Sequence, residues 1–140
     1  MKLSVELPLA APDALMTCAL AIESAGFDAC FVTDHPFPSR DWLTTGGHET
    51  VDPFVALSFA AAATRCLRLH TNCLIPAYRN PYLTAKSVAS LDACSRGRVI
   101  LGVAVGYLRA EFEGLGVPFS ERAVLLDETL WAMKAAWTDQ

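Results

Sequence analysis

The sequence predicts an α/β fold of four consecutive strand–helix units, (βα)4, which together make half of a TIM (βα)8 barrel. Strand-like apolar segments alternate with longer segments of helical period along the 140 residues, an order that favours a parallel sheet. Links from helix to strand are short, whereas links from strand to helix are long. The last strand-like segment is almost continuously apolar, which is typical of a parallel strand buried on both faces.

Four segments have the length and the apolar content of strands. They are LSVEL (3–7), ACFVT (29–33), LRLHTNCLI (67–75) and RVILGVAV (98–105). Their spacing of roughly 30 residues accommodates one helix between successive strands, so we expect right-handed crossover connections.

A helix is expected after each of these strands. The predicted starts lie near Pro12, Pro53, Pro81 and Ser120. Proline suits the first turn, and a preceding Asp52 or Asn80 can accept hydrogen bonds from free backbone N–H groups. Apolar positions at helical spacing predict the buried faces of the first and last helices: Leu15, Cys18/Ala19, Ile22 and Ala25, with Gly26 as C-cap, and Leu126, Leu130, Met133 and Trp137.

The long links indicate where a functional site would lie. The two longest, residues 34–52 and 106–120, both follow strands, so they lie beyond the carboxyl ends of the sheet. Parallel α/β folds carry their sites on that face. A flavodoxin-like open sheet is the main rival fold, but it requires a phosphate-binding first loop, and the segment LPLAAPD contains no glycine.

Four βα units leave a barrel half closed. Such a half exposes two strand edges and an apolar face, and both promote association. We therefore expect residues 1–140 to form a single domain. It would be the N-terminal half of a longer barrel enzyme, truncated after the fourth helix, or a half that self-associates. The expected macromolecular partners are accordingly a C-terminal half or further copies of the chain.

Composition argues against several classes of protein. The chain is 53% hydrophobic and 19% charged, with a net charge of −4, so nucleic acids and anionic membranes are not expected partners. The five cysteines form no CxxC pair, and we interpret them as buried, reduced thiols. The N-terminus makes a poor signal peptide and no apolar run is long enough to span a bilayer, which predicts a cytoplasmic protein.

An Asp-His pair, Asp34 and His35, ends the second predicted strand and precedes Pro36. An imidazole on the functional face is a plausible proton donor or acceptor, because it titrates near pH ~6.5. His35 is therefore the candidate catalytic residue. Asp34 could orient neighbouring groups or fix the loop. The alternative is a purely structural turn in which Asp34 caps its own backbone.

The other histidines, His48 and His70, are not at metal-ligand spacing, so we expect no metal site. His70 lies in mid-strand, where a hydrogen-bonded structural side chain is the favoured interpretation. His48 lies in the long loop near Trp42 and could belong to a lid, although a solvated side chain is favoured. A metal-dependent barrel hydrolase, the weakest functional alternative, would need a cluster of histidines and carboxylates that the sequence lacks.

Polar and small residues mark the ends of the third and fourth strands. Thr71 and Asn72 interrupt an apolar strand, and buried polar groups need hydrogen-bond partners or a ligand. Gly102 and Gly106 would let a flat ligand approach the backbone closely. The chain contains no glycine-rich phosphate loop, GxSxG elbow or HExxH motif, so the sequence offers no support for those chemistries.

Four segments carry a resemblance to a known family: AIESAGFDACFVTDHPFP, DPFVALSFAAAATRCLRLHTNCLI, the run from Arg79 to Leu130 and the closing AAW. They resemble the bacterial-luciferase-like monooxygenase family, and more closely its branch of deazaflavin-dependent oxidoreductases. The matching segments cover nearly all of the chain after residue 20. The resemblance implies a luciferase-like (βα)8 barrel, of which the chain matches the first four units.

The resemblance also implies site residues. In the family a flavin or deazaflavin ring lies over the carboxyl ends of the strands, and His35 matches a histidine that borders the ring. Asn72-Cys73 matches a bulge with a non-proline cis peptide behind the ring, and Gly106 and Tyr107 match the fourth-strand end beside it. Tyr107 stands where some sugar-phosphate-oxidising relatives have a glutamate, so their proton-transfer scheme is not carried over.

Two functions from different classes follow. The first is an oxidoreductase or monooxygenase that uses coenzyme F420, which is favoured, or FMN, on an unidentified small organic substrate. The second is a catalytically incomplete half barrel, the product of a truncated or split gene, that is inactive alone or pairs with another chain. In the family, much of the cofactor phosphate contact comes from the second half of the barrel. The predicted site comprises His35 as catalytic residue and Asp34, Thr71, Asn72, Cys73, Gly106 and Tyr107 as cofactor-binding residues.

Overall fold

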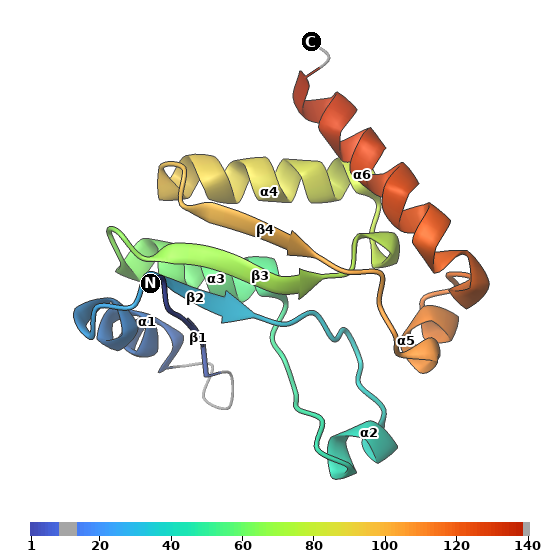
Figure 1. The fold of residues 1–140 in the computed structure, drawn as a ribbon, viewed down its shortest axis with the longest axis horizontal. Helices are drawn as coiled ribbons and strands as arrows, with labels where there is room; N and C mark the ends of the chain where they lie inside the picture. Colours follow the sequence, from blue (N-terminus) through green and yellow to red (C-terminus); the bar gives the residue numbers. More distant parts are fainter. Residues whose placement is uncertain (9–13, 139–140) are drawn as a thin grey trace.

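The computed structural model describes residues 1–8 and 14–138. Within these residues it contains four parallel strands, β1 (Ser4–Glu6), β2 (Ala29–Val32), β3 (Arg68–Leu74) and β4 (Val99–Val103). They form one sheet in the order β1-β2-β3-β4 (Figure 1). Sequential parallel strands lie side by side, which requires a crossover between each pair. The predicted (βα)4 alternation is confirmed, and each strand is slightly shorter than predicted.

The described residues form the helices α1 (Leu15–Ser24), α2 (Arg40–Thr44), α3 (Pro53–Ala63), α4 (Pro81–Ser95), α5 (Arg109–Gly114) and α6 (Arg122–Thr138), and the short 3-10 helices η2 (Pro76–Tyr78) and η3 (Phe119–Glu121). As predicted, α3 and α4 begin at prolines and are capped by the side chains of Asp52 and Asn80. The predicted start near Pro12 lies outside the described residues. None of the described helices is long and apolar enough to cross a membrane.

The two long loops contain short helices that the sequence pattern did not predict. The helix α2 lies in the loop after β2, and Figure 1 shows it projecting beyond the carboxyl end of the sheet. The helix α5 follows β4 and leads through η3 into α6. The predicted start of the last helix at Ser120 falls in η3, so α6 begins two residues later than expected, at Arg122.

The main core lies between one face of the sheet and the helices α1, α3 and α4. Leu15, Ala19 and Ile22 of α1 are buried there, as the helical spacing predicted, whereas Ala25, just after the helix, is exposed. The opposite face carries Phe31, which is in register with His70 on the next strand. Both side chains are only half-buried. In a closed barrel this second face would line the lumen.

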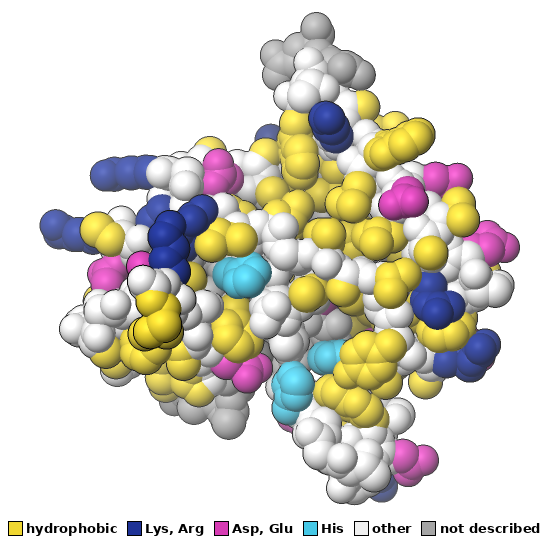
Figure 2. Space-filling view, in the orientation of Figure 1, with side chains coloured by type: hydrophobic (Ala, Val, Ile, Leu, Met, Phe, Trp, Pro, Cys, Tyr) yellow, Lys and Arg dark blue, Asp and Glu magenta, His cyan; other side chains and the backbone are white. Residues whose placement is uncertain are grey.

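The helix α6 buries only part of its predicted face. Met133 is fully buried, but Trp137 is 41% exposed, and its indole N–H donates to the carbonyl of Ala85 over 3.0 Å. A groove of about 370 Å³ runs beside β4, and it is lined by Val88, Ala89, Asp92, Val99, Leu101 and Trp137. Figure 2 shows hydrophobic side chains gathered where β4 meets α6. Among the described strands β4 has one unpaired edge.

Candidate functional site

A cavity of about 370 Å³ lies at the carboxyl ends of β2, β3 and β4. Its position agrees with the face that the loop lengths predicted. Residues that directly follow β2 form one wall, the end of β3 forms the floor, and the segment after β4 forms the other wall. The lining residues are Thr33, Asp34, His35, His48, Asn72, Cys73, Ile75, Ala104, Val105, Gly106 and Tyr107.

His35 forms a hydrogen bond away from the cavity, to a buried carboxylate. Its Nδ1 lies 3.3 Å from Oε1 of Glu111, and its side chain is 12% exposed. Glu111 in turn accepts a hydrogen bond of 2.9 Å from the hydroxyl of Tyr78. Burial, this hydrogen bond and the nearby charge of Glu111 raise the pKa of Tyr78. Within the described residues, Nε2 of His35 has no hydrogen-bond partner.

Aromatic rings surround His35. The Trp42 ring, on α2, lies with its centroid 4.5 Å from that of His35, and the Tyr107 ring lies 6.1 Å away at a steep angle. His48 packs edge-on at 5.6 Å, and its Nε2 lies 3.0 Å from the hydroxyl of Thr33. The favoured expectation that His48 is simply solvated is therefore corrected: the side chain remains exposed to solvent, but it also lines the cavity.

Asp34 is engaged with protein groups rather than free to bind a ligand. It is 3% exposed, and its Oδ1 accepts a hydrogen bond of 2.8 Å from Nη2 of Arg79. Its Oδ2 accepts another, of 3.1 Å, from the backbone N–H of Ile75. Arg79 also donates to Asp52 over 2.9 Å. This geometry gives Asp34 the role of fixing the loop and offers no support for the predicted contact between its carboxylate and a cofactor.

The end of β3 is irregular. The peptide bond between Asn72 and Cys73 is cis, as the family resemblance implied, and the register with β4 shifts between Thr71 and Leu74. Asn72 and Cys73 line the cavity. Thr71 does not, because its hydroxyl donates to the carbonyl of Gly102 at 2.8 Å and accepts from its N–H at 3.0 Å. A direct contact between Thr71 and a cofactor is therefore unsupported by this geometry.

Two glycines of the fourth βα unit are required by close packing. Gly106 has a φ of +79°, and a Cβ there would lie 2.8 Å from the ring of Phe112 and 3.1 Å from Ile75. A Cβ on Gly102 would collide with the carbonyl of Thr71 and lie 2.8 Å from the His70 ring. Gly106 thus lets α5 pack beneath the cavity wall, whereas Gly102 makes room for a neighbouring strand.

His70 lies outside the cavity. Its ring packs edge-on against Phe31 at 6.4 Å on the open face of the sheet. Burial, together with the positive charge of Arg68, lowers the pKa of His70. No side-chain hydrogen bond to His70 is present within the described residues, so the expected hydrogen-bonded structural role is not what the structure shows. The ring is packed against an aromatic side chain instead.

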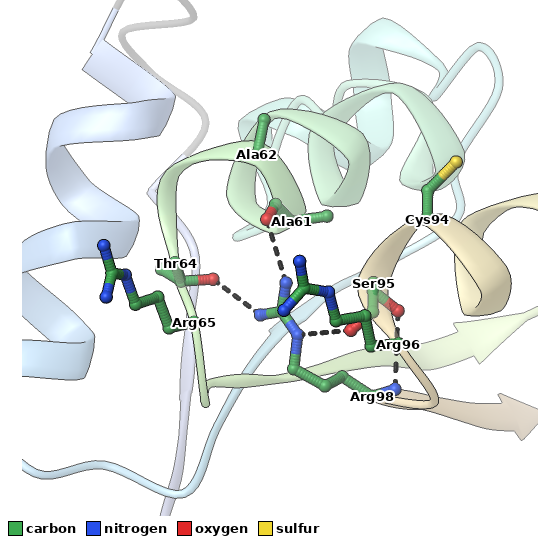
Figure 3. A pocket seen from close by; sticks show the side chains of 8 residues that line it. All are labelled: Ala61, Ala62, Thr64, Arg65, Cys94, Ser95, Arg96 and Arg98. Atoms are coloured by element: carbon green, nitrogen blue, oxygen red, sulfur yellow. Dashed lines mark hydrogen bonds between the residues drawn. The ribbon is translucent and has the colours of Figure 1, made fainter.

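A larger cavity of about 570 Å³ lies at the opposite end of the sheet, beside the C-termini of α3 and α4 (Figure 3). Arg98 occupies it structurally: its guanidinium donates to the carbonyls of Ala61, Leu67 and Ser95 and to the hydroxyl of Thr64. A cation at two helix C-termini satisfies unpaired carbonyls and offsets both helix dipoles. The polar groups that Arg98 contacts in this larger cavity are thus explained by the capping of helices. The cavity beside His35 is therefore the candidate site.

The cysteines are less uniformly buried than expected. All five are free thiols, but Cys66 and Cys94 are exposed and only Cys30 is fully buried. Burial raises the pKa of Cys30 to about 11. Within residues 1–8 and 14–138, no group of three or more His, Cys, Asp and Glu side chains is placed to hold a metal ion.

Among the charged residues at the site, Glu111 and Arg79 were not identified from the sequence. A faint signal exists for Glu111, because it directly precedes Phe112 and Leu108 precedes it by three residues, which puts it on an apolar helical face. No comparable signal exists for Arg79, whose partners Asp34 and Asp52 lie 45 and 27 residues away.

Comparison with known proteins identifies the family. The model of the luciferase-like monooxygenase family matches residues 3–140. The chain belongs to this family. The fold agrees, because four parallel strands alternating with helices correspond to part of the luciferase-like barrel. The recognition drawn from the sequence segments is therefore confirmed.

Three proteins illustrate the similarity. The chain is 36% identical over 134 residues to an F420-dependent glucose-6-phosphate dehydrogenase of Beutenbergia cavernae, covering 93% of this chain and 38% of that one. An F420-dependent secondary alcohol dehydrogenase, solved with an F420-acetone adduct, is 25% identical with a TM-score of 0.79, over 99% of this chain and 43% of that one. A type II Baeyer-Villiger monooxygenase from a Pseudomonas putida plasmid, in complex with FMN, is 16% identical with a TM-score of 0.84. That match covers 100% of this chain and 40% of the monooxygenase.

These matches also fix how much of a family member the chain represents. It spans 46% of an uncharacterized protein of Mycobacterium tuberculosis and 38% of the glucose-6-phosphate dehydrogenase. The chain therefore spans less than half the length of these curated relatives.

Proposed function

We propose that the chain supplies the ring-binding half of the active site of an oxidoreductase that uses coenzyme F420. The observation that carries this proposal is the cavity at the strand carboxyl ends, where His35 and Tyr107 face the Asn72-Cys73 floor. F420 is favoured over FMN because two of the relatives described above, at 36% and 25% identity, are F420-dependent enzymes, whereas the FMN-binding monooxygenase is 16% identical. The substrate would be a small organic molecule.

The cavity suits the flat end of such a cofactor. Its walls combine aromatic rings with small apolar side chains, including Ala104, Val105 and Ile75, and Gly106 adds no side chain. Among the described lining residues there is no Lys or Arg to bind a phosphate, and Arg79 is already paired with two carboxylates. The residues therefore fit the ring and leave the phosphate-bearing tail to groups outside this half of the barrel.

In this proposal His35 handles the substrate proton. When bound, a deazaflavin supplies hydride transfer at a ring carbon and reduced FMN supplies oxygen activation. Because Nδ1 of His35 is held by Glu111, Nε2 is the nitrogen that would accept or return a proton. Trp42 packs against that imidazole and Tyr107 lies beside it, and Asn72 and Cys73 form the floor against which the ring would lie.

We also infer that four further βα units complete the barrel, on the same or another polypeptide. The unpaired edge of β4 and the apolar groove between β4 and Trp137 are the surfaces that they would cover. A half barrel that is inactive alone remains the alternative function. We expect the 140-residue chain to associate when purified, because its open sheet face and strand edges are exposed.

Equilibrium titration tests the proposal. The chain, alone and after co-refolding with the C-terminal half of a family member, is titrated with F420 and separately with FMN while fluorescence quenching is followed. We expect saturable binding of F420 that tightens with the C-terminal half and weakens at least tenfold in Tyr107→Ala. Arg65→Ala, at the opposite end of the sheet, is the matched control. Absence of saturable binding in every mixture would reject a cofactor site.

Size-exclusion chromatography tests the inferred completion of the barrel. The chain alone should elute as a dimer or larger species, and addition of the C-terminal half should convert it to a complex of one copy of each. A monomer that unfolds in one cooperative transition would show that this half needs no partner.

A further inference from the structure

A buried carboxylate lies behind His35 rather than in the cavity wall. Glu111, on α5, is 1% exposed. Its two oxygens are used separately: Oε1 meets Nδ1 of His35 at 3.3 Å, and Oε2 accepts from the Tyr78 hydroxyl at 2.9 Å. Among the described residues no Lys or Arg pairs with it. Since a carboxylate removed from water is costly unless hydrogen bonds compensate, the His35 and Tyr78 contacts are what stabilise it.

The surrounding packing holds these side chains in one arrangement. Phe112, the next residue on α5, packs edge-on against Tyr78 at 4.7 Å, and it fills the space above Gly106 that a Cβ would otherwise occupy. The backbone of His35 is tied to Thr50, whose hydroxyl donates to the His35 carbonyl at 3.0 Å. The contact between Glu111 and His35, 76 residues apart, is therefore fixed from both sides.

We propose that Glu111 is a positioning residue that sets the tautomer of His35, with Tyr78 fixing the carboxylate. An ionised carboxylate can only accept hydrogen bonds, so Nδ1 must carry the proton. A neutral imidazole then has its lone pair on Nε2, which is the nitrogen left to act on a substrate. The use of Nε2 rests on the proposed function, whereas the tautomer itself does not.

Nuclear magnetic resonance of the histidine side chains tests the proposal without any cofactor. Long-range ¹H–¹⁵N spectra of the ¹⁵N-labelled 140-residue chain are recorded at about pH 8, where an unperturbed imidazole is neutral. His48→Asn and His70→Asn assign the three histidines. We expect the Nδ1 of His35 to show the protonated-nitrogen signature and Nε2 the unprotonated one. A His35 protonated on Nε2 in the unmodified chain would overturn the proposal before any variant is made.

Variants separate positioning from simple packing. Glu111→Gln should move His35 towards a mixture of tautomers, because an amide can present either its oxygen or its N–H to Nδ1. Tyr78→Phe, which keeps the aromatic contact with Phe112, should cause a smaller shift in the same direction. Glu113→Gln is the matched control, since Glu113 lies on the same helix with a 65% exposed side chain near Arg109. An unchanged His35 signature in Glu111→Gln would overturn the proposal.

The His70 signal reports whether a variant is folded, because His70 lies on β3 away from the carboxylate. If Glu111→Gln perturbs it, the unmodified chain and Tyr78→Phe decide the outcome. Failure of F420 binding together with an Nδ1-protonated His35 would reject the proposed function but not the tautomer assignment. F420 binding together with an Nε2-protonated His35 would support the proposed function and reject the tautomer assignment.

Discussion

The guanidinium of Arg79 donates to the carboxylate of Asp34 over 2.8 Å, across 45 residues of chain. Burial disfavours the charge of Arg79, but the two carboxylates that it contacts raise its pKa overall. The pair ties the end of β2 to the segment after β3, and the second contact to Asp52 holds the base of the long loop that carries Trp42 and His48. The wall of the cavity thus depends on an ion pair between the lining residue Asp34 and Arg79, which lies outside the lining.

Arg79→Met should destabilise the fold. The substitution leaves the Asp34 carboxylate, whose side chain is 2% exposed, with only the N–H of Ile75 as partner. Breaking a buried pair in this way costs about 2–3 kcal/mol when one partner is partly exposed. Urea denaturation measures the change. Arg109→Met is the control, because its contact with Glu113 is exposed and such pairs contribute less than about 0.5 kcal/mol; equal losses in the two variants would contradict the assignment.

His35→Ala should impair turnover more than folding. In a barrel completed by a C-terminal half, loss of a general acid or base lowers kcat by roughly 10²–10⁴-fold. The thermal midpoint should also fall, because buried Glu111 loses one of its two partners, but the loss should be modest beside that in turnover, since the bond to Tyr78 remains. Steady-state kinetics and thermal denaturation of the same samples provide the comparison, with Arg65→Ala as the control. Full activity in His35→Ala would exclude the proton-transfer role.

Gly106→Ala should be more damaging than an alanine at another glycine with positive φ. The backbone at Gly106 (φ +79°) and at Gly116 (φ +70°) is unfavourable for any residue with a Cβ. At Gly106 the new Cβ would also lie 2.8 Å from the ring of Phe112, whereas at Gly116 nothing lies within 4 Å of it. We expect a loss of about 1 kcal/mol for Gly116→Ala and about 2–4 kcal/mol for Gly106→Ala. Similar values in urea denaturation would show that packing beneath the cavity wall is loose.

Glu23 should make the free energy of unfolding depend on pH under acidic conditions. Its carboxylate accepts hydrogen bonds from the backbone N–H groups of Arg65, Cys66 and Leu67, at 3.0, 2.7 and 2.8 Å. Burial opposes ionisation, but these hydrogen bonds and the charge of Arg98 prevail and lower the pKa of Glu23 from 4.5.

The direction of this effect follows from linkage. Because the folded pKa of Glu23 lies below the unfolded value, the stabilisation is present above about pH 4.5 and is lost as the pH falls through the folded pKa. Glu23→Gln should therefore lower the free energy of unfolding at neutral pH by about 1–2 kcal/mol. The gap to the unmodified chain should narrow in acid. Glu128→Gln, an exposed position on α6, should change stability little at either pH.

Much of the fold could be predicted because its signals are local. The starts of helices α3 and α4 were indicated by prolines that follow the capping residues Asp52 and Asn80. Apolar runs indicated all four strands. Prediction failed where packing overrides the pattern. The helices α2 and α5 are short segments in long loops, and Trp137, although on the predicted face of α6, reaches an open groove beside β4 and stays partly exposed.

The candidate site divides in the same way. The loop asymmetry and the family segments placed His35, Asn72, Cys73, Gly106 and Tyr107 around one cavity, and all five line it. The sequence could not show which polar partners Asp34 and Thr71 would choose, because strand ends offer several backbone and side-chain groups at similar cost. In the structure, Asp34 pairs with the guanidinium of Arg79, and the hydroxyl of Thr71 donates to the carbonyl of Gly102.

By itself the sequence determined the order of strands and helices, the parallel sheet and the edge of that sheet where a site would lie. These features follow from apolar runs, the 3.6-residue helical period and the lengths of the links, all of which can be recognised within short segments of the chain. Tertiary structure alone decided that Glu111 lies behind His35 and that Arg79 fixes Asp34. The members of the first pair are 76 positions apart in the sequence, and those of the second are 45 positions apart. Such contacts exist only once helices and loops have packed, and no local pattern in the sequence specifies which side chains then meet.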